Sequence, residues 1–403
     1  MNLFLTLGLV FALGISGGVL LEKIKVPKIV WYLILGLLLG PSVLNLADPV
    51  LLGISPILRQ IALVIILTRS GLSLDFSTLR KIGRPAILLC FVPACFEMVG
   101  ISLFGPLILG ISFPEALLLG SVLAAVSPAI VVPRMIAWKK LGYGKEHRFP
   151  EAILAGSSCD DVFVIVLFYA FKGFVATGEA PNAIDILQIP LGIVLGIGTG
   201  IGLGFMLSAL LKKTHFPNPV KIAFLLGVFF LLIGLETLIK PYVSFSSLLA
   251  ILSLAIVIST RRKEEAPKIE EGYKSLWTGF ELLLFVLVGM ECDAGRLFSQ
   301  EGALLIGLLF IGLSFRSLGV FLCFLGTPFT KKERLCAILC YLPKATVQAS
   351  IGGIALLEGL PVGGLILTAA VASILVSAPL GAWSMDLSYK RLLSLSPRSE
   401  AES

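Results

Sequence analysis

Two adjacent aspartates are the residues of this sequence with the clearest capacity for chemistry. Asp160 and Asp161 close the stretch Ser157-Ser158-Cys159-Asp160-Asp161 in the middle of a long apolar segment. Successive residues of a helix point about 100° apart, so the two carboxylates face different surroundings and we expect them to have different roles. Two carboxylates this close disfavour double ionisation, and such a pair titrates as a unit.

The pair predicts an exchange chemistry. A hard cation such as Na⁺ or Li⁺ takes oxygen ligands, which the two carboxylates and nearby hydroxyls supply; Ser157 and Ser127 are the candidate hydroxyls. Protons compete for the same oxygens, so the binding of one species expels the other. We therefore expect Asp161 and Asp160 to bind Na⁺ or Li⁺ and H⁺ in alternation, with no cofactor.

Three further charges lie inside apolar segments, namely Glu97, Arg316 and Lys344. A charge at the centre of a spanning helix costs about 2.5–3.5 kcal/mol on insertion scales, so such residues mark an ion or proton path. Burying Glu97 or Arg316 without a counter-charge is expensive, so we expect these two to pair; the alternative is that each faces its own water-filled crevice. Lys344 would either offset the carbonyl ends of a broken helix or exchange protons itself.

The elements that hold these charges must be membrane-spanning helices. The chain has 403 residues, of which 57% are hydrophobic and 14% charged, whereas soluble domains are about 45–50% apolar and 25% charged. Because about 20 apolar residues cross a bilayer core, the sequence predicts an all-α polytopic membrane protein. The thirteen expected spans cover residues 2–21, 28–46, 55–73, 85–110, 115–137, 151–173, 187–211, 221–239, 243–260, 274–292, 302–327, 335–357 and 362–388.

The distribution of basic residues predicts the orientation of these spans. With the N-terminus outside, 26 of the 32 Lys and Arg residues fall on the cytoplasmic side, as the positive-inside rule requires. The C-terminus is then cytoplasmic, and the net charge of +7 needs no nucleic-acid partner. The first apolar segment has no basic region before it and no cleavage signature after it, so we expect it to stay as a span of the plasma (inner) membrane.

Two triplets of predicted spans have opposite orientations and similar interruptions. The triplets are 85–110, 115–137 and 151–173, and 302–327, 335–357 and 362–388. The middle span of the first carries Pro128 and Pro133, and that of the second carries Pro343. Proline removes a helical hydrogen bond, and membrane proteins tolerate such breaks where the freed backbone lines a cavity. Paired broken helices in an inverted repeat indicate a secondary-transporter site; the alternative is two ordinary proline kinks.

Three motifs, in this order, resemble the monovalent cation/proton antiporter superfamily, and within it the NHA branch of sodium/proton exchangers. They are AVSPAIVVP at 125–133, the Asp160-Asp161 pair, and PKATVQA at 343–349. The resemblance implies a sodium/proton antiporter-like fold with two crossed broken helices, a homodimer and an elevator-like alternating-access movement. It implies panel helices in 1–80, core helices in 81–176, a linker and panel helices in 177–300, core helices in 301–390, and a short cytoplasmic tail in 391–403.

The resemblance also implies roles for single residues. Asp161 matches the main cation and proton carboxylate and Asp160 its partner, while Arg316 matches a basic residue in the helix before the second break. Some antiporters carry an acid within the first break, where this chain has Ser127-Pro128, so the ligand set departs from that pattern. Relatives with two aspartates are often electrogenic, but a Glu97–Arg316 pair would leave the stoichiometry open.

Other functions fit the sequence less well. A sodium-coupled solute symporter of similar inverted-repeat fold is the main alternative; it would transport an organic anion and would not need paired aspartates. A channel would conduct without proton coupling. An intramembrane aspartyl protease needs two aspartates that face each other from different helices, which adjacent residues cannot do, so we expect no enzymatic activity.

Overall fold

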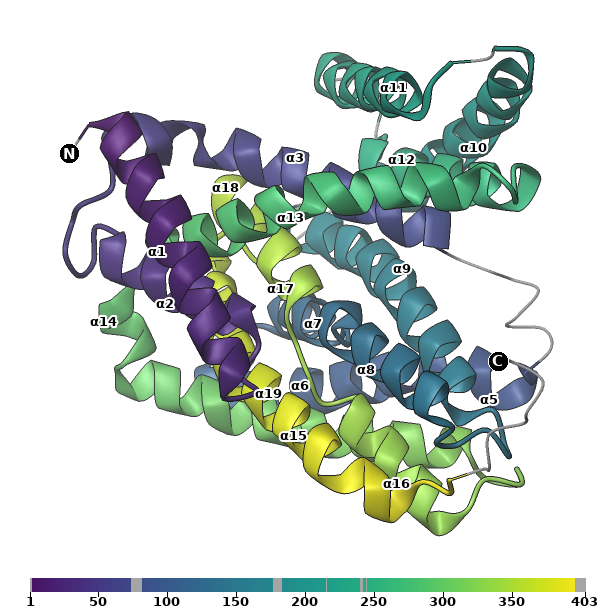
Figure 1. Cartoon of the computed structure of the whole chain (residues 1–403). Coiled ribbons are helices and arrows are strands. Elements are labelled where there is room, and N and C mark those ends of the chain that lie inside the picture. Colours follow the sequence, from purple (N-terminus) through teal and green to yellow (C-terminus); the bar gives the residue numbers. More distant parts are fainter. Residues whose placement is uncertain are drawn as a thin grey trace.

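The computed structural model describes residues 2–73, 82–176, 183–214, 216–239, 242–243 and 245–395, without the side chains of 158 and 183–190. Apart from an isolated bridge between Tyr143 and Leu395, the regular elements of these residues are helices (Figure 1). They are α1 (Leu3–Lys23), α2 (Lys28–Leu39), α3 (Pro49–Ser73), α5 (Arg84–Leu89), α6 (Val92–Leu109), α7 (Phe113–Leu123), α8 (Pro128–Leu141), α9 (Phe149–Ala176), α10 (Ala183–Lys213), α11 (Asn218–Ile239), α12 (Ser247–Arg261), α13 (Ala266–Glu291), α14 (Ala294–Leu297), α15 (Gln300–Cys323), α16 (Lys331–Cys340), α17 (Thr346–Ile351), α18 (Ile354–Leu357) and α19 (Gly363–Leu392).

The helices have the lengths and composition of a polytopic membrane protein. In the described part of the chain, ten helical segments are long and apolar enough to cross a membrane. Three of the predicted spans, 28–46, 243–260 and 335–357, correspond to shorter apolar helices instead. The predicted all-α membrane architecture is confirmed, whereas the count of thirteen spans stays a prediction. The end of the predicted tail, residues 396–403, lies outside the described residues.

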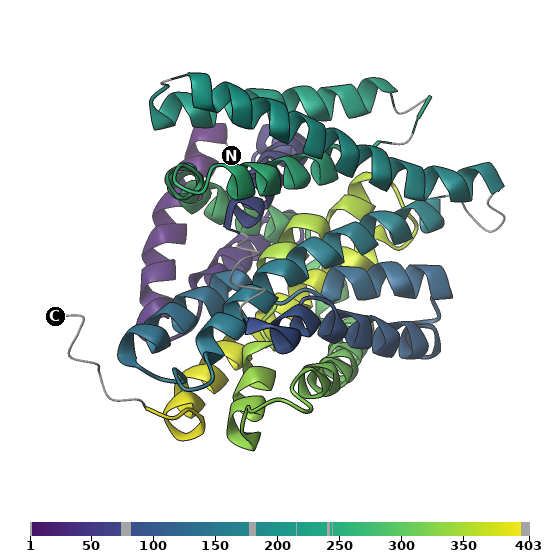
Figure 2. The same ribbon diagram turned by 90° about the vertical axis from the view of Figure 1, so that its right-hand side faces the viewer.

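The helices pack in two groups. In the central bundle, defined here as α5–α9 with α15–α19, α6 lies along α15, α7 along α9, and α16 against α19. In the flanking bundle, defined as α1–α3 with α10–α13, α2 and α3 pack on α13, and α10 packs on α12. Figures 1 and 2 show α10–α13 extending over one side of the central bundle. The two groups meet where α10 and α3 contact α9, where α2 contacts α19, and where α3 and α13 contact α17.

Glycines allow the backbones of the flanking bundle to approach closely. A Cβ at Gly36 of α2 would lie 2.0 Å from the carbonyl oxygen of Val286 in α13, and one at Gly289 would lie 2.4 Å from the carbonyl oxygen of Leu33. No side chain fits at such distances, so α2 and α13 are in backbone contact. Small residues at interfaces are a general means of packing helices in lipid, where a hydrophobic driving force between them is missing.

Three segments that are far apart in the sequence meet at one end of the molecule. The Gly144 N–H, in the turn between α8 and α9, donates to the Ser394 carbonyl at 2.9 Å. The Trp383 indole of α19 donates to the Ile24 carbonyl, in the turn between α1 and α2, at 3.4 Å. All three segments carry basic residues that the sequence places on the cytoplasmic side, and the structure brings them to a common face.

Candidate ion site

Two helix breaks cross at the centre of the molecule. The first lies between Leu123, the end of α7, and Pro128, the start of α8, and the second lies between α16 and α17. The Ser127 N–H of the first break donates to the Pro343 carbonyl of the second at 2.8 Å. Pro128 fits the first position of α8, where a helix N–H has no intrahelical partner. The prolines therefore interrupt the helices, and the backbone of one break forms a hydrogen bond with the backbone of the other.

Gln348 of α17 fastens the two breaks together. Its Nε2 donates to the carbonyls of Ala125 at 2.9 Å and Leu123 at 3.3 Å, and its Oε1 accepts the Ala345 N–H at 2.9 Å. A primary amide supplies both donors and an acceptor, so one fully buried side chain satisfies backbone groups that the missing helical turns leave unpaired. The sequence gave no reason to assign a role to Gln348. The feature that could have identified it is a polar residue within an apolar segment, one turn after the break.

Pro133 requires a correction, because it does not lie in a break. It is the sixth residue of α8 and lies inside the helix. Its ring nitrogen cannot donate to the carbonyl of Ala129, but the helix continues to Leu141. The physical reason is that a single missing hydrogen bond kinks a helix without ending it when the following turns are well packed.

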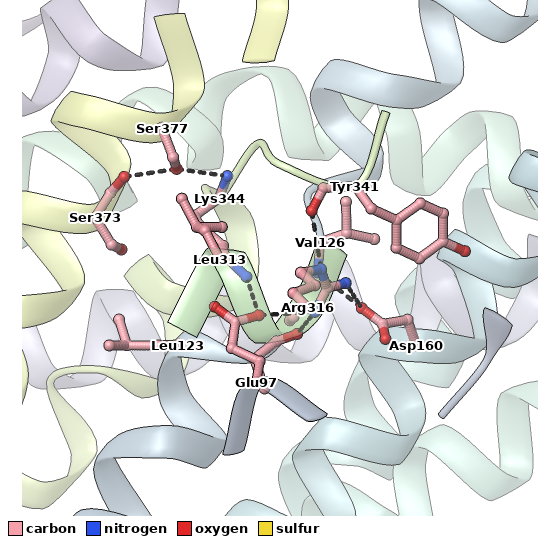
Figure 3. Close-up of polar contacts among 12 residues, drawn as sticks. Glu97, Leu123, Val126, Asp160, Leu313, Arg316, Tyr341, Lys344, Ser373 and Ser377 are labelled. Atoms are coloured by element: carbon pink, nitrogen blue, oxygen red, sulfur yellow. Dashed lines mark hydrogen bonds and ion pairs between the residues drawn. The ribbon is translucent and has the colours of Figure 1, made fainter. Parts of the chain in front are cut away.

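A buried charge network surrounds the crossing (Figure 3). Arg316 of α15 reaches Glu97 of α6 with Nη1 at 2.9 Å and Asp160 of α9 with Nη2 at 2.9 Å. Its Nε donates to the Tyr341 carbonyl in the second break at 2.8 Å. Lys344 extends from the same break, with Nζ 2.6 Å from Glu97 Oε2. All four ionisable side chains are at most 1% exposed.

The network is closed by bonds from both breaks. The Val126 N–H of the first break donates to Asp160 Oδ2 at 2.7 Å, and Arg316 Nη1 also donates to the Ala124 carbonyl. In the second break, the Lys344 N–H donates to the Ser377 hydroxyl of α19 at 3.0 Å. Asp160 is therefore held by a guanidinium and a backbone amide, which fixes its position and its charge.

Asp161 has different surroundings from its neighbour. Its side chain is 3% exposed, and its Oδ1 makes no hydrogen bond among the side chains and backbone that the structure describes. It faces a small cavity between α9, α17 and α3, in which Thr346, Ser350 and Ser70 are the other polar residues. Asp161 is thus a buried carboxylate with an oxygen available to a small cation or a proton.

The two serines expected as ligands lie close to the aspartates in the chain or across the first break. The Ser157 hydroxyl, one helical turn before Asp161, donates to the Leu154 carbonyl at 3.3 Å. The Ser127 hydroxyl is fully buried and has no hydrogen-bond partner within the described residues; it follows Val126, whose N–H donates to Asp160. Neither serine lines the small cavity at Asp161, and their role as ligands stays a prediction.

The charges at the crossing nearly cancel. If all four residues are ionised, the two positive charges of Arg316 and Lys344 balance the two negative charges of Glu97 and Asp160. Asp161, when ionised, then adds one uncompensated negative charge. A lone buried charge is costly, so the arrangement favours the neutralisation of Asp161.

A larger cavity, of about 210 Å³, lies between the two bundles. On one side it is lined by Ala129, Ile130 and Pro133 of α8, and on the other by the turn between α1 and α2 and by Glu281 of α13. The Glu281 carboxylate pairs with Lys28 at 2.9 Å. The cavity lies at the end of the molecule where the basic segments meet, and its α8 wall begins two residues after Ser127.

Comparisons with known proteins agree with this geometry. The sodium/hydrogen exchanger 9B2 of Homo sapiens is 33% identical over 407 residues, which cover 96% of this chain and 74% of that protein. The sodium/hydrogen exchanger 9B1 of Homo sapiens is 32% identical over 414 residues, which cover 98% and 78%. The solved structure of the sodium proton antiporter MjNhaP1 from Methanocaldococcus jannaschii at pH 8 matches with a TM-score of 0.80 at 22% identity, over 97% of this chain and 99% of that one.

Fold and site together define a polytopic membrane protein of the ion-transporter class, with two broken helices crossing at a buried charge network. The chain belongs to the transmembrane sodium/hydrogen exchanger family, whose model matches residues 8–385. The resemblance to monovalent cation/proton antiporters is therefore confirmed, as is the antiporter-like fold.

Proposed function

We propose that this protein exchanges one Na⁺ or Li⁺ for one H⁺ by alternating access, and that Asp161 is the carboxylate both ions use. The observation that carries the proposal is the contrast between the two aspartates. Each aspartate has a buried Oδ1 without a partner in the described structure, but Asp160 Oδ2 accepts from Arg316 and the Val126 N–H, whereas no such bond to Asp161 is found among the described residues. Asp160 then acts as a fixed charge of the site rather than as a ligand that changes occupancy.

Charge balance supports the one-to-one exchange. With Arg316, Lys344, Glu97 and Asp160 neutral as a group, the site is neutral when Asp161 holds either one proton or one alkali cation. When Asp161 holds a proton or a cation, the neutral site can move through the low-dielectric region. When Asp161 is empty, the site carries a buried charge, and the cost of that charge prevents the movement. This stoichiometry is electroneutral.

The packing supports a movement of one bundle past the other. Both breaks and all the charges of the site belong to the central bundle, which we propose as the ion-carrying core. The flanking bundle would be the stationary panel and the contact surface of a homodimer. The cavity of about 210 Å³ is bounded by both bundles at the end that carries the basic segments. We propose that this is the cytoplasmic access route of an inward-facing state, with the protein in the plasma membrane, its N-terminus outside and its C-terminus inside.

The test is transport by purified protein in proteoliposomes with an imposed pH gradient. Addition of Na⁺ or Li⁺ should dissipate the gradient with the wild type, and Asp161→Asn should abolish this dissipation. The variant should fold and melt as the wild type does, because no hydrogen bond of the Asp161 carboxylate that the substitution would break is found among the described residues. Exchange at the normal rate by Asp161→Asn would overturn the proposal. Sodium-driven uptake of an organic anion without proton movement would point to a symporter instead.

A further inference from the structure

We propose that Arg59 of α3 is a gate that closes the route from Asp161 to the face of the molecule opposite the basic segments. In the state described here its guanidinium rests on Gly353, between α17 and α18. It must leave this position before an ion can exchange with that face. The inference rests on the alternating access proposed above and goes beyond it, because it names a contact that one of the two states has to break.

Arg59 lies directly beyond the small cavity at Asp161. Leu63, one turn later on α3, lines that cavity. Ile351, the last residue of α17, lines it as well, and Gly353 follows two residues later. The contact between Arg59 and Gly353 therefore covers the end of the cavity toward which α17 runs.

The partner of Arg59 shows which face this is. Its Nη2 lies 2.7 Å from Oε2 of Glu291, the last residue of α13. α13 begins beside the basic turn after α12 and has 26 residues, enough to cross a bilayer core. Glu291 and Arg59 therefore lie toward the face opposite the basic segments. The Ser55 hydroxyl, one turn before Arg59, donates to Glu291 Oε1 at 2.6 Å and fixes the carboxylate.

Gly353 accommodates the guanidinium because it has no side chain. A Cβ at this position would lie 2.0 Å from Arg59 Nη1, so the charged group rests directly on the glycine backbone. The backbone at Gly353 is helical, with φ −88°, a conformation that any residue adopts. The close approach of Arg59 is therefore what requires glycine here, and the local backbone is not.

The contact joins the two bundles and is incompletely bonded. Arg59 and Glu291 belong to the flanking bundle and Gly353 to the central bundle, so a displacement of one bundle past the other separates them. The Arg59 side chain is 4% exposed, yet its Nε makes no hydrogen bond within the described residues. A buried donor without a partner destabilises the state that contains it. The guanidinium can thus leave Gly353 at a reduced cost, with Glu291 still beside it.

The charge of Arg59 adds to the steric closure. A guanidinium on the route to Asp161 repels a cation that approaches from the opposite face, as fixed arginines do in selective pores. The same contact then blocks water by its volume and Na⁺ by its charge while the other face is open. Both effects end when the arginine moves away from Gly353.

The first test is Gly353→Ala, whose Cβ takes the space of Arg59 Nη1. That atom ends a flexible side chain, so the arginine should move and the variant should still fold. In vesicles with the protein in one orientation, the KM for Na⁺ added on the face opposite the basic segments should fall about threefold or more, because apparent affinity follows the fraction of molecules open to that face. The KM on the basic side should stay the same or rise. Gly53→Ala on α3, where a Cβ would meet no atom within 4 Å, is the control and should change neither value.

A second variant tests the same contact without relying on the first. Arg59→Ala removes the guanidinium and should lower the same KM by a similar factor. Adding Gly353→Ala to Arg59→Ala should change that KM by less than about 1.5-fold, because the new methyl group then meets no arginine and the two effects are not additive. Independent, additive effects would show that the two residues do not act on each other, and would overturn the assignment.

The outcomes separate this inference from the proposed function. If Asp161→Asn abolishes exchange while Gly353→Ala and Arg59→Ala leave the KM on the opposite face unchanged or raise it, the gate is wrong and the proposed function stands. If Asp161→Asn leaves exchange intact, the proposed function itself fails. An equal fall in KM on both faces would also overturn the gate, because it would show a change at the ion site and no shift between the two states.

Discussion

At the scale of single residues, the site separates a fixed carboxylate from a free one on successive positions of the same helix. The 100° turn between neighbours directs Asp160 toward Arg316 and the first break, and Asp161 toward α3 and α17. Glu97 accepts from two cations, Arg316 and Lys344. In the proposed exchange, the partners of Arg316, Lys344, Glu97 and Asp160 stay the same, and ion occupancy changes only at Asp161.

Asp160→Asn should lower the stability of the folded protein far more than Asp161→Asn. It removes a charge from a buried pair and leaves the Arg316 guanidinium partly uncompensated, which costs on the order of 3–5 kcal/mol. Thermal unfolding in detergent measures the difference. Equal melting temperatures for the two variants would show that Asp160 is not held as the structure places it.

The apparent KM for Na⁺ should rise as the pH on the same side falls, because protons and Na⁺ compete for the Asp161 carboxylate. In the acidic range the apparent KM should increase about tenfold for each unit by which the pH falls, because the proton concentration then increases tenfold. The rate at saturating Na⁺ should stay constant. Initial rates at several Na⁺ concentrations and pH values give both quantities. A fall in maximal rate at constant KM would instead indicate protonation at a separate regulatory site.

At the scale of elements, the two broken helices form one unit. The backbone bond from Ser127 to Pro343 and the side chain of Gln348 join segments from opposite halves of the chain. Irregular backbone at membrane depth is tolerated only where its polar groups are satisfied by protein or water. The breaks therefore depend on each other: each provides the partners that the other lost when its helix ended.

Gln348→Ala should destabilise the crossing. The change leaves the Ala345 N–H and the carbonyls of Ala125 and Leu123 without their partner, at about 1–3 kcal/mol for each buried group that finds no substitute. The melting temperature should fall and exchange should weaken together. Gln300→Ala, at an exposed position at the start of α15, is the control. A stable and active Gln348→Ala variant would mean that water replaces the amide.

The turn between α12 and α13 makes a smaller, pH-dependent contribution. Burial tends to raise the pKa of Glu265, but its hydrogen bond to Lys221 at 3.0 Å and the charges of Lys221 and Arg262 outweigh that effect and lower it. A lowered pKa in the folded state contributes stability above the ordinary glutamate pKa, and this stability is lost as the pH falls through the lowered value. Glu265→Gln should therefore cost less than about 1 kcal/mol at neutral pH and nothing in strong acid. Melting curves across pH measure it, and a cost that persists in acid would contradict this account.

At the scale of the whole molecule, two bundles share one small cavity at Asp161 and one larger cavity at the end with the basic segments. The flanking bundle contacts the central bundle chiefly through α10 on α9 and α2 on α19, and also through α3 and α13. Within it, α2 and α13 are locked by glycine contacts, while the bonds between breaks lock the central bundle. The proposed movement of one bundle past the other would be a rigid-body displacement along these helix contacts.

The exchange should be electroneutral. If Asp161 alternates between one Na⁺ and one H⁺, a complete cycle moves no net charge, so the rate should be the same at zero and at an imposed membrane potential. Proteoliposomes with the potential set by valinomycin and K⁺ measure this, after transport of K⁺ itself has been checked. A rate that follows the potential would show that a second titrating group, of which Lys344 is the nearest candidate, takes part in the cycle.

The sequence by itself determined that the helices of this protein lie in a membrane, and which charged residues and helix breaks they contain. A chain that is 57% hydrophobic must place its helices in lipid, prolines mark where two of them end, and five charges at membrane depth identify the segments that matter. Composition and local backbone chemistry are properties of the chain, so they can be predicted without knowing what packs against what. The same reasoning placed Pro133 in a break, because a proline that only kinks a helix cannot be distinguished in the sequence from a proline at a helix end.

Only the tertiary structure decided which groups meet. Arg316 and Asp160 are 156 positions apart, and Lys344 and Glu97 are 247 apart, so no local pattern could show that four charges form one neutral group. For the same reason the sequence could not show that residues of α17 and α3 line the small cavity at Asp161. The direction of each side chain is set by how the helices cross, and that depends on the packing of the whole molecule.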